Sequence, residues 1–373
     1  MGCSIYPIAA VIRSQDSPTL HRVPAGEIDF APLDNFQDRI FSQRRPWLEF
    51  IKSFTGGKII IARIEQQESI IGYFTGILFR RCGVPILGSP FPGWTTPFMG
   101  FNLPPGFPRA CLLKPLERWA FRELGCLHLE IRDRYLLAED ADGLNFGQTS
   151  FRGYLSDLTP SEDRIFSGMA SCRRRAIRKA EKNGLTVEAA SADGFAEEYY
   201  EQISDVFARQ GLTPTYSLDR VQKLIDHVHP SGDLLLARVR EPGGKTIAAG
   251  IYAGFGRLSY YWGSGSLGKY QFLRPNELLH WFALRYWKSR GAREHEWGAA
   301  GAYKAKYGPS PLDVPSFRKS RYAVIDYARS AAEHAYYMPR EFKRKLYQSE
   351  ILSRIASKIS SYLVGTEVFL AVC

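Results

Sequence analysis

The chain has 373 residues, which is enough for two domains or for one large domain with a sizeable buried core. Its 45% hydrophobic and 23% charged residues are ordinary for a globular protein, and no window approaches the 18 apolar residues of a membrane-spanning helix. The net charge of +11 indicates an anionic partner, for which phosphorylated small molecules, nucleic acid and an anionic membrane surface all qualify.

Six cysteines are scattered along the chain, and none belongs to a Cys-x-x-Cys pair. This distribution argues against a zinc site and against a disulfide framework. The opening residues, MGCSIYPIAAVIRSQDSP, lack a basic region followed by a long apolar core, so a secretory signal is not expected. We therefore predict a reduced, cytoplasmic protein with no metal site.

The first part of the chain predicts a helix, three strands, a helix and a strand. An amphipathic helix over residues 45–54 precedes an antiparallel meander over 58–90. A longer helix and a short strand follow within residues 114–133, separated by Gly125, which is placed as a left-handed helix C-cap.

The same order recurs roughly 170 residues later, a spacing that favours duplicated domains. A helix over residues 217–228 precedes a meander over 233–265, and a helix and strand follow within 276–298, with Gly291 as the C-cap. Both meanders open with three apolar residues and Ala-Arg and end at Gly-Ser. Six elements in the same register predict an internal duplication.

A basic segment, residues 159–184, joins the two copies. Thr159, Pro160 and Glu162 form the pattern of a capping box, and Asn183-Gly184 forms a C-cap signature. We therefore predict one helix between these ends.

Helical spacing continues over residues 194–210, where apolar side chains recur every three or four positions. A basic helix is expected over residues 339–358. The final residues, 361–373, are too short to span a bilayer, and we expect them to pack on the surface.

Three segments resemble the Fem-like acyltransferases of the GNAT superfamily. They are RRRAIRKAEKNGLTVE (173–188), LSYYWGSGS with PNELLHWFALRYWKSRG (258–291), and AYKAKYG (302–308). They resemble both the peptidoglycan-bridge aminoacyltransferases (FemABX) and the wider Fem-like family linked to polysaccharide and cell-envelope biosynthesis. The resemblance runs from about Trp47 to Arg321 and implies an α+β protein of two tandem GNAT-like domains. Each domain would hold a mixed, mostly antiparallel sheet flanked by helices.

The duplication and the resemblance together predict four regions. These are a first GNAT-like domain (1–158), a basic linker helix (159–184), a second GNAT-like domain carrying the active site (185–330) and a C-terminal helical tail (331–373).

The resemblance also implies catalytic residues. Lys304 matches the lysine of the family's aromatic-Lys-x-x-aromatic-Gly signature, which binds phosphate near the reacting centre, and Lys306 is expected to lie in solvent. A GNAT unit splays its central strands apart and offers a free backbone N–H to the reacting carbonyl, here near residues 260–263. Glu296 and Tyr303 rank first as general base or proton relay, ahead of Tyr261 and Glu277.

Further side chains are candidates for substrate binding. Arg175 and Arg178 share a helix face and form either a phosphate clamp or a solvated surface. The glycine-rich loop over residues 263–277 either exposes backbone N–H groups to donor phosphate or is only a turn. A Pro-, Gly- and aromatic-rich segment, 88–108, either shapes the acceptor site or is a rigid surface loop. The candidates are Arg175, Arg178, Trp262, Gly263, Ser264, Asn276, Glu277 and Trp94.

The function that this pattern implies is an acyltransferase. It would transfer an acyl group from acyl-CoA, or a carrier thioester, to an amine of a phosphorylated cell-envelope or secondary-metabolite precursor by direct attack. The chain departs from the family in lacking a coiled-coil insertion and a clean acyl-CoA pyrophosphate loop, so the donor stays open. Aminoacyl-tRNA is the alternative donor, and a non-catalytic binder of an anionic glycan or nucleic acid is the alternative of another class. Peripheral membrane contact is a further candidate interaction of the protein.

Overall fold

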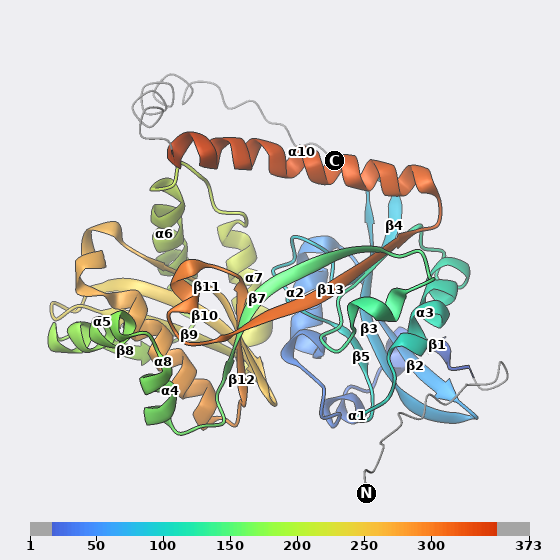
Figure 1. Cartoon of the computed structure of the whole chain (residues 1–373), viewed down its shortest axis with the longest axis horizontal. Coiled ribbons are helices and arrows are strands. Elements are labelled where there is room, and N and C mark those ends of the chain that lie inside the picture. Colours follow the sequence, from blue (N-terminus) through green and yellow to red (C-terminus); the bar gives the residue numbers. More distant parts are fainter. Residues whose placement is uncertain (1–16, 349–373) are drawn as a thin grey trace, which may run out of the picture.

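The computed structural model of the chain describes residues 17–348 (Figure 1). Its first half contains the predicted series of a helix, three strands, a helix and a strand, together with additional short elements. The elements are β1 (Thr19–Arg22), α1 (Ala31–Asp34), α2 (Arg45–Thr55), β2 (Lys58–Gln66), β3 (Ser69–Arg81), β4 (Val84–Ser89), β5 (Gly100–Asn102), α3 (Ala110–Arg122), β6 (His128–Ile131) and β7 (Gly147–Asp157).

The second half repeats this series and adds a long terminal helix. Its elements are α4 (Glu162–Gly168), α5 (Ser171–Lys182), β8 (Thr186–Ala189), α6 (Phe195–Ala208), α7 (Leu218–Val228), β9 (Leu234–Arg240), β10 (Thr246–Phe255), β11 (Leu258–Ser266), α8 (Pro275–Ser289), β12 (Glu294–Ala299), α9 (Ala302–Ala305), β13 (Ser310–Ser320) and α10 (Ala323–Gln348). Short 3-10 helices, among them η5 (Gly268–Leu273), connect several of them.

The tandem repeat is confirmed strand by strand. β2, β3 and β4 form one antiparallel meander and β9, β10 and β11 form the other. In each copy the strand after the long helix pairs in parallel with the end of the meander, β6 with β4 and β12 with β11. The helix before each of these strands ends at a left-handed glycine, with φ of 68° at Gly125 and 90° at Gly291.

The two copies exchange their last strands. β7 follows β6 in the chain but pairs with β12, whereas β13 follows β12 but pairs with β6. β7 and β13 also pair with each other, so the described chain forms one thirteen-stranded sheet in the order β1-β2-β3-β4-β6-β13-β7-β12-β11-β10-β9-β8, with β5 beside β3. Figure 1 shows β7 and β13 running from one half to the other. The predicted domain boundaries stay a prediction, because this sheet is shared.

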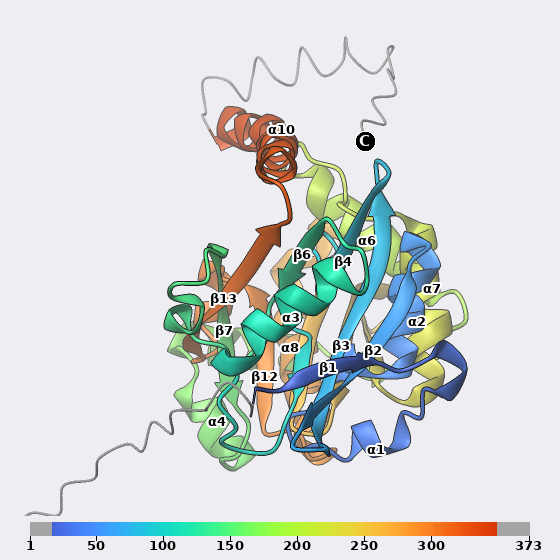
Figure 2. The ribbon, with the colours of Figure 1, turned by 90° about the vertical axis from the view of Figure 1, so that its right-hand side faces the viewer.

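An apolar core also joins the two copies. Phe41 of the first copy stacks on Tyr260 of the second at 5.5 Å between ring centroids, and Trp47 packs edge-on against Phe41. All three rings are buried in one cluster that includes residues of α2, α6 and α7. Figure 2 shows α2 and α7 on the same side of the sheet. Separating the copies would therefore expose a large aromatic surface.

The basic segment between the copies forms two helices, so the prediction of a single helix was wrong. α4 begins after Ser161, whose side chain accepts a hydrogen bond from the Arg164 N–H at 3.3 Å, while Thr159 bonds to Asp157 instead. The break lies at Met169 and Ala170, where the backbone is extended and Met169 is buried. Extended residues cannot continue the helical hydrogen bonds, so α4 ends at this point.

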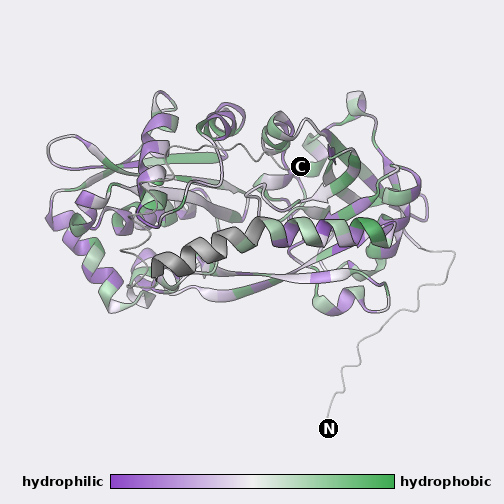
Figure 3. Cartoon of the chain, turned by 90° about the horizontal axis from the view of Figure 1, so that it is seen from above, coloured by the Kyte–Doolittle hydropathy of each residue, from purple (hydrophilic) through white to green (hydrophobic). Residues whose placement is uncertain are grey.

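The C-terminal helix begins earlier than predicted. α10 starts at Ala323 rather than near residue 339, and the end of the predicted helix and the segment 361–373 lie outside the described residues. α10 crosses the outside of the molecule over both copies (Figure 1), and Figure 3 views it from above. Within residues 17–348, no helix is long and apolar enough to cross a membrane.

Candidate active site

The central strands of the second copy splay apart. β11 and β12 pair in parallel only from Leu258 opposite Glu294 to Tyr260 opposite Glu296. Beyond this point β11 continues to Ser266 beside β10, and β12 keeps its pairing with β7, with a register shift between Glu296 and Ala299. The splay therefore begins next to Tyr261, within the range expected from the sequence, and it leaves backbone groups of β11 without a strand partner on one side.

Lys304 lies at this splay. It belongs to α9, is only 8% exposed, and donates a hydrogen bond from Nζ to the Ala299 carbonyl at the end of β12 at 2.8 Å. Nζ also lies 5.0 Å from the ring centroid of Tyr261 on β11. Burial lowers the pKa of Lys304 to about 8, although the nearby Glu296 carboxylate acts in the opposite direction.

Glu296 is the second ionisable group of this site. Its side chain is completely buried; Oε1 accepts a hydrogen bond from the Gly298 N–H at 2.7 Å, and Oε2 has no partner among the described residues. Burial raises the pKa of Glu296 to about 8, against the Gly298 bond and the charges of Lys304, Arg132 and Arg134. The two arginines belong to the first copy, so both copies shape the charge of this carboxylate.

A chain of hydroxyl groups leads from the surface toward the splay. Tyr303 is 44% exposed, and its hydroxyl donates to the Tyr261 hydroxyl over a long 3.4 Å. The Tyr261 hydroxyl lies 3.0 Å from Ser264 Oγ. The ring of Tyr303 stacks on His280, which is buried and bonded to the Tyr252 hydroxyl. Burial lowers the pKa of His280 well below its usual value, so this imidazole is neutral.

An arginine that the sequence analysis did not single out holds this region together. Arg173 is buried and donates one hydrogen bond to Glu277 at 2.6 Å and one to the Tyr303 carbonyl at 3.2 Å. Its guanidinium also lies 4.5 Å from the ring centroid of Tyr307. Arg173 therefore ties α5 and α8 to the loop that carries Lys304. The signal was present in the sequence, since Arg173, Ile177 and Ala180 share one helix face.

Arg175 and Arg178 lie on the other face of α5. Both are exposed, and Arg178 lies over the ring of Phe166 at 5.4 Å. Helical periodicity explains this arrangement, because the buried face is set by Arg173, Ile177 and Ala180. The substrate-binding role of these two arginines stays a prediction.

Arg173→Met is expected to lower the free energy of unfolding by about 3 kcal/mol, because Glu277 would keep a half-buried charge without its partner. The matched substitution Arg175→Met, on the exposed face of the same helix, is expected to change it by less than about 0.5 kcal/mol. Urea unfolding of both variants checks this. Equal effects at the two positions would show that Arg173 does not anchor the site.

The predicted glycine-rich loop has a packing role at Gly263. A Cβ atom at this position would collide with Oη of Tyr199, which lies 2.6 Å from the Tyr216 hydroxyl. Trp262, the residue before Gly263, is buried, and its ring centroid lies 4.6 Å from that of Tyr216. Its Nε1 has no hydrogen-bond partner among residues 17–348. Close packing thus accounts for glycine here, whether or not the loop binds a ligand.

Gly263→Ala is expected to lower the free energy of unfolding by about 1 to 3 kcal/mol, because the added methyl group overpacks a buried contact. Tyr199→Phe removes the colliding oxygen and costs about 1 kcal/mol for the lost hydrogen bond. The double variant should therefore be more stable than the sum of the two single effects. Strict additivity in urea unfolding would contradict this packing argument.

The remaining candidates occupy two different places. Asn276, at the start of α8, donates to Ser266 Oγ at 2.8 Å, and its buried Oδ1 has no partner in the described part of the chain. Trp94 is buried in the first copy, where it packs against Phe79 and Phe91. These contacts place Trp94 in a core rather than in the Lys304 region, and its role at the acceptor side stays a prediction.

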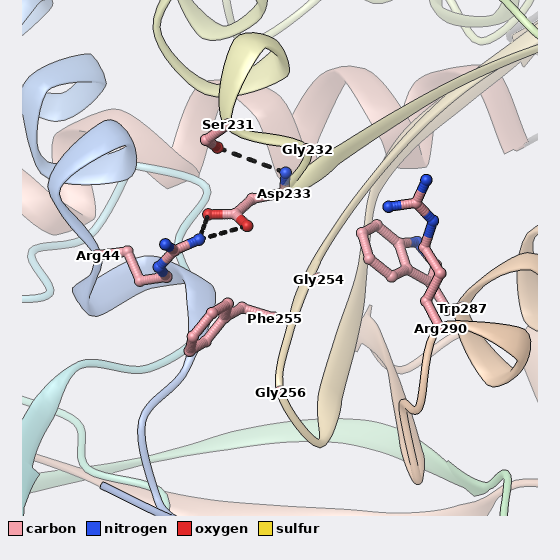
Figure 4. A pocket seen from close by; sticks show the side chains of 9 residues that line it. All are labelled: Arg44, Ser231, Gly232, Asp233, Gly254, Phe255, Gly256, Trp287 and Arg290. Carbon is pink, nitrogen blue, oxygen red and sulfur yellow. Dashed lines mark hydrogen bonds and ion pairs between the residues drawn. The ribbon is translucent and has the colours of Figure 1, made fainter. Parts of the chain in front are cut away.

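A separate hollow lies where the two copies meet (Figure 4). It has a volume of about 350 Å³ and is lined in part by Arg44, Asp233, Trp287 and Arg290. Arg44 binds both carboxylate oxygens of Asp233 and lies 4.0 Å from the Phe255 ring centroid. The Arg44–Asp233 ion pair therefore links the two copies at this hollow.

A second buried histidine, His295, distinguishes this region from a purely apolar core. His295 lies on β12 next to Glu296, bonds through Nδ1 to Ser259 and leaves Nε2 without a partner in the described chain. Burial lowers the pKa of His295 to about 3, so it is neutral. Within residues 17–348, no group of three His, Cys, Asp or Glu residues is placed to hold a metal ion.

The comparison with protein families identifies this half of the chain. Residues 170–307 match the family model of an acetyltransferase (GNAT) domain. The chain carries a GNAT acetyltransferase domain. The match contains the strand splay together with Arg173, Glu296 and Lys304, and the predicted enzyme class, a transferase, is confirmed.

Solved structures are similar to this chain as well. The crystal structure of FemX covers 80% of this chain and 97% of its own, with 14% identity and a TM-score of 0.67. The structure of L-PGS from Bacillus licheniformis (75% and 93% covered, 13% identity, TM-score 0.46) is also similar. So is a tandem GNAT protein from the clavulanic acid biosynthesis pathway (71% and 83% covered, 11% identity, TM-score 0.45). No curated protein matches the sequence. The FemX comparison extends the shared fold to both copies.

Proposed function

We propose that the protein is an N-acyltransferase that uses acyl-CoA or a carrier thioester as donor. The acceptor is an amine of a phosphorylated cell-envelope or secondary-metabolite precursor. One observation carries this proposal: a buried carboxyl and a buried ammonium, Glu296 and Lys304, lie at the strand splay of the GNAT domain, both with pKa values of about 8.

The chemistry requires a neutral amine, a donor for the carbonyl oxygen and close approach of the two substrates. The unpartnered Oε2 of Glu296 is the acceptor that takes a proton from the substrate ammonium. The amine then attacks the thioester carbonyl, the C–N bond forms, and the C–S bond breaks as the thiol leaves with a proton. Backbone N–H groups of β11 beyond Tyr260 stabilise the oxyanion.

Lys304 is assigned to phosphate. Its Nζ carries three donors, of which the described residues occupy one through the Ala299 carbonyl. Two N–H groups therefore remain for a phosphate oxygen of the acceptor or for developing negative charge. Tyr303, half-exposed and hydrogen-bonded to Tyr261, is placed as a proton relay between solvent and the splay.

Aminoacyl-tRNA is the second candidate donor, and one surface favours it. α5 exposes a row of cations for which the described residues provide no ion pair, and Glu188, a possible neutralising acid, pairs with Arg240 instead. The row consists of Arg175, Arg178, Lys179 and Lys182. Such a row fits the phosphate backbone of RNA.

Calorimetric titration of the purified protein with acetyl-CoA at physiological salt separates the two donors. Saturable binding with a micromolar dissociation constant is the expected result, followed by mass-spectrometric screening of phosphorylated amines as acceptors. If no heat is observed, acetyl-CoA is rejected as the donor, and transfer from charged tRNA to the same amines becomes the test of the second candidate.

A further inference from the structure

α10 turns a polar face toward the rest of the protein. Arg329 donates to Glu130 of β6 at 2.8 Å, and Glu333 accepts from both Arg329 at 2.7 Å and Arg318 of β13 at 3.0 Å. Ser330 accepts a further bond from Arg318 at 3.3 Å. These contacts hold the helix by ion pairs and hydrogen bonds.

The outer face of α10 is apolar. Val324, Tyr327 and Met338 are 71%, 79% and 71% exposed, and Tyr322, just before the helix, is 53% exposed. Exposed alanines continue the same stripe between them, at positions 328, 331 and 335. Val324, Ala331 and Met338 are seven residues apart, so they share one side of the helix. Figure 3 shows hydrophilic and hydrophobic residues alternating along this helix, which runs across the outside of the molecule.

This arrangement is the reverse of an ordinary surface helix, which buries its apolar stripe and exposes its charges. Contiguous exposed apolar side chains of this kind mark interaction sites. The ion pairs on the inner face fix the helix so that the stripe points away from both copies. The geometry therefore requires a partner for the outer face of α10.

The charge of the segment that follows the stripe indicates what kind of partner covers it. Between residues 339 and 348 the sequence has four cations, Arg340, Lys343, Arg344 and Lys345, against one acid, Glu341. An apolar stripe with exposed tyrosines beside a basic segment is the pattern of a helix that lies in the interface of an anionic membrane. A second copy of the chain fits less well, because each copy brings a net charge of +11.

We propose that α10 docks the protein on an anionic membrane surface, with Val324, Tyr327 and Met338 inserted at the headgroup boundary. The inference stands independently of the acyl donor and of the Glu296 chemistry. It places the acceptor among molecules that are presented at, or delivered to, a membrane surface.

Vesicle co-sedimentation of the full-length protein tests this docking. Vesicles of phosphatidylcholine with 30% phosphatidylglycerol should bind the protein, whereas pure phosphatidylcholine vesicles should bind at least about tenfold less, because the basic segment needs anionic lipid. The double variant Val324→Asp/Tyr327→Asp should lose at least about tenfold of the binding to anionic vesicles. The control variant Ile70→Asp/Leu137→Asp, which also adds two charges at exposed apolar positions, should bind as the wild type does.

Three outcomes would overturn the docking. The first is no binding to either vesicle, and the second is equal loss in the two double variants. The third is a wild-type dimer in light scattering that becomes a monomer in Val324→Asp/Tyr327→Asp without vesicle binding, which would assign the stripe to a second copy. Thermal unfolding of both variants should match that of the wild type, because all four positions are exposed. Acetyl-CoA binding should stay unchanged in all of them, so failure of this inference is distinct from failure of the proposed reaction.

Discussion

Lys304→Ala is expected to lower kcat/KM by about 100-fold or more with a phosphorylated amine acceptor. Removal of a preorganised donor that faces developing charge typically costs this much. Nζ of Lys304 is held by the Ala299 carbonyl and flanked by the Tyr261 ring, so water cannot replace it in the same position. If Lys304 binds acceptor phosphate, KM should rise, and the affinity for acetyl-CoA should be unchanged.

Lys306→Ala provides the matched control. Lys306 lies two residues further along the same loop but is exposed, and it carries the same charge. A general loss of positive charge would affect both variants alike, whereas a specific role would affect only Lys304→Ala. Steady-state kinetics and donor titration on both proteins decide the matter. If Lys304→Ala kept wild-type kcat/KM, the lysine would have a purely structural role.

Local patterns made the duplicated fold predictable. Each meander, its flanking helices and the caps at Gly125 and Gly291 are encoded by periodicity and glycine placement within short windows. The strand exchange was not predictable in this way, because β7 pairs with β12 across more than a hundred residues of chain. Either of two similar units offers an edge for β7, and the sequence does not say which one.

The sequence drew attention to two ionisable groups of the candidate site but not to the residues that support them. Lys304 and Glu296 were singled out from a motif and from a strand end, and the structure brings them together at the splay. Arg173 was overlooked because it stands in a run of three arginines. Only the helical spacing to Ile177 and Ala180 shows which of the three lies on the buried face. His280 was overlooked because a histidine on an apolar helix face gives no sign of what it faces across the core.

Glu296→Gln is expected to stabilise the protein while it removes activity. Glutamine keeps an oxygen that can accept the Gly298 hydrogen bond but cannot ionise. Burial raises the pKa of Glu296 from 4.5 to about 8, so between these values the folded state holds a proton that the unfolded state has released. The free energy of unfolding of the wild type therefore falls as pH rises through this window. The free energy of unfolding of the variant does not fall in this way, because glutamine cannot ionise. Its melting temperature should therefore equal that of the wild type near pH 4.5 and exceed it at pH 8.

Activity should change in the opposite direction. A general base must be ionised and Lys304 must keep its charge, so kcat/KM of the wild type should pass through a maximum near pH 8, and the rising limb reports ionisation of the carboxyl in the Glu296–Lys304 pair. In Glu296→Gln this limb should disappear and kcat should fall by about 100-fold or more at pH 8. Glu294→Gln, two residues earlier on β12 and paired with Arg134, should keep the limb. Higher stability joined to lost activity would identify Glu296 as a group that is kept buried for its chemistry, whereas an unchanged pH profile would leave it a structural acid.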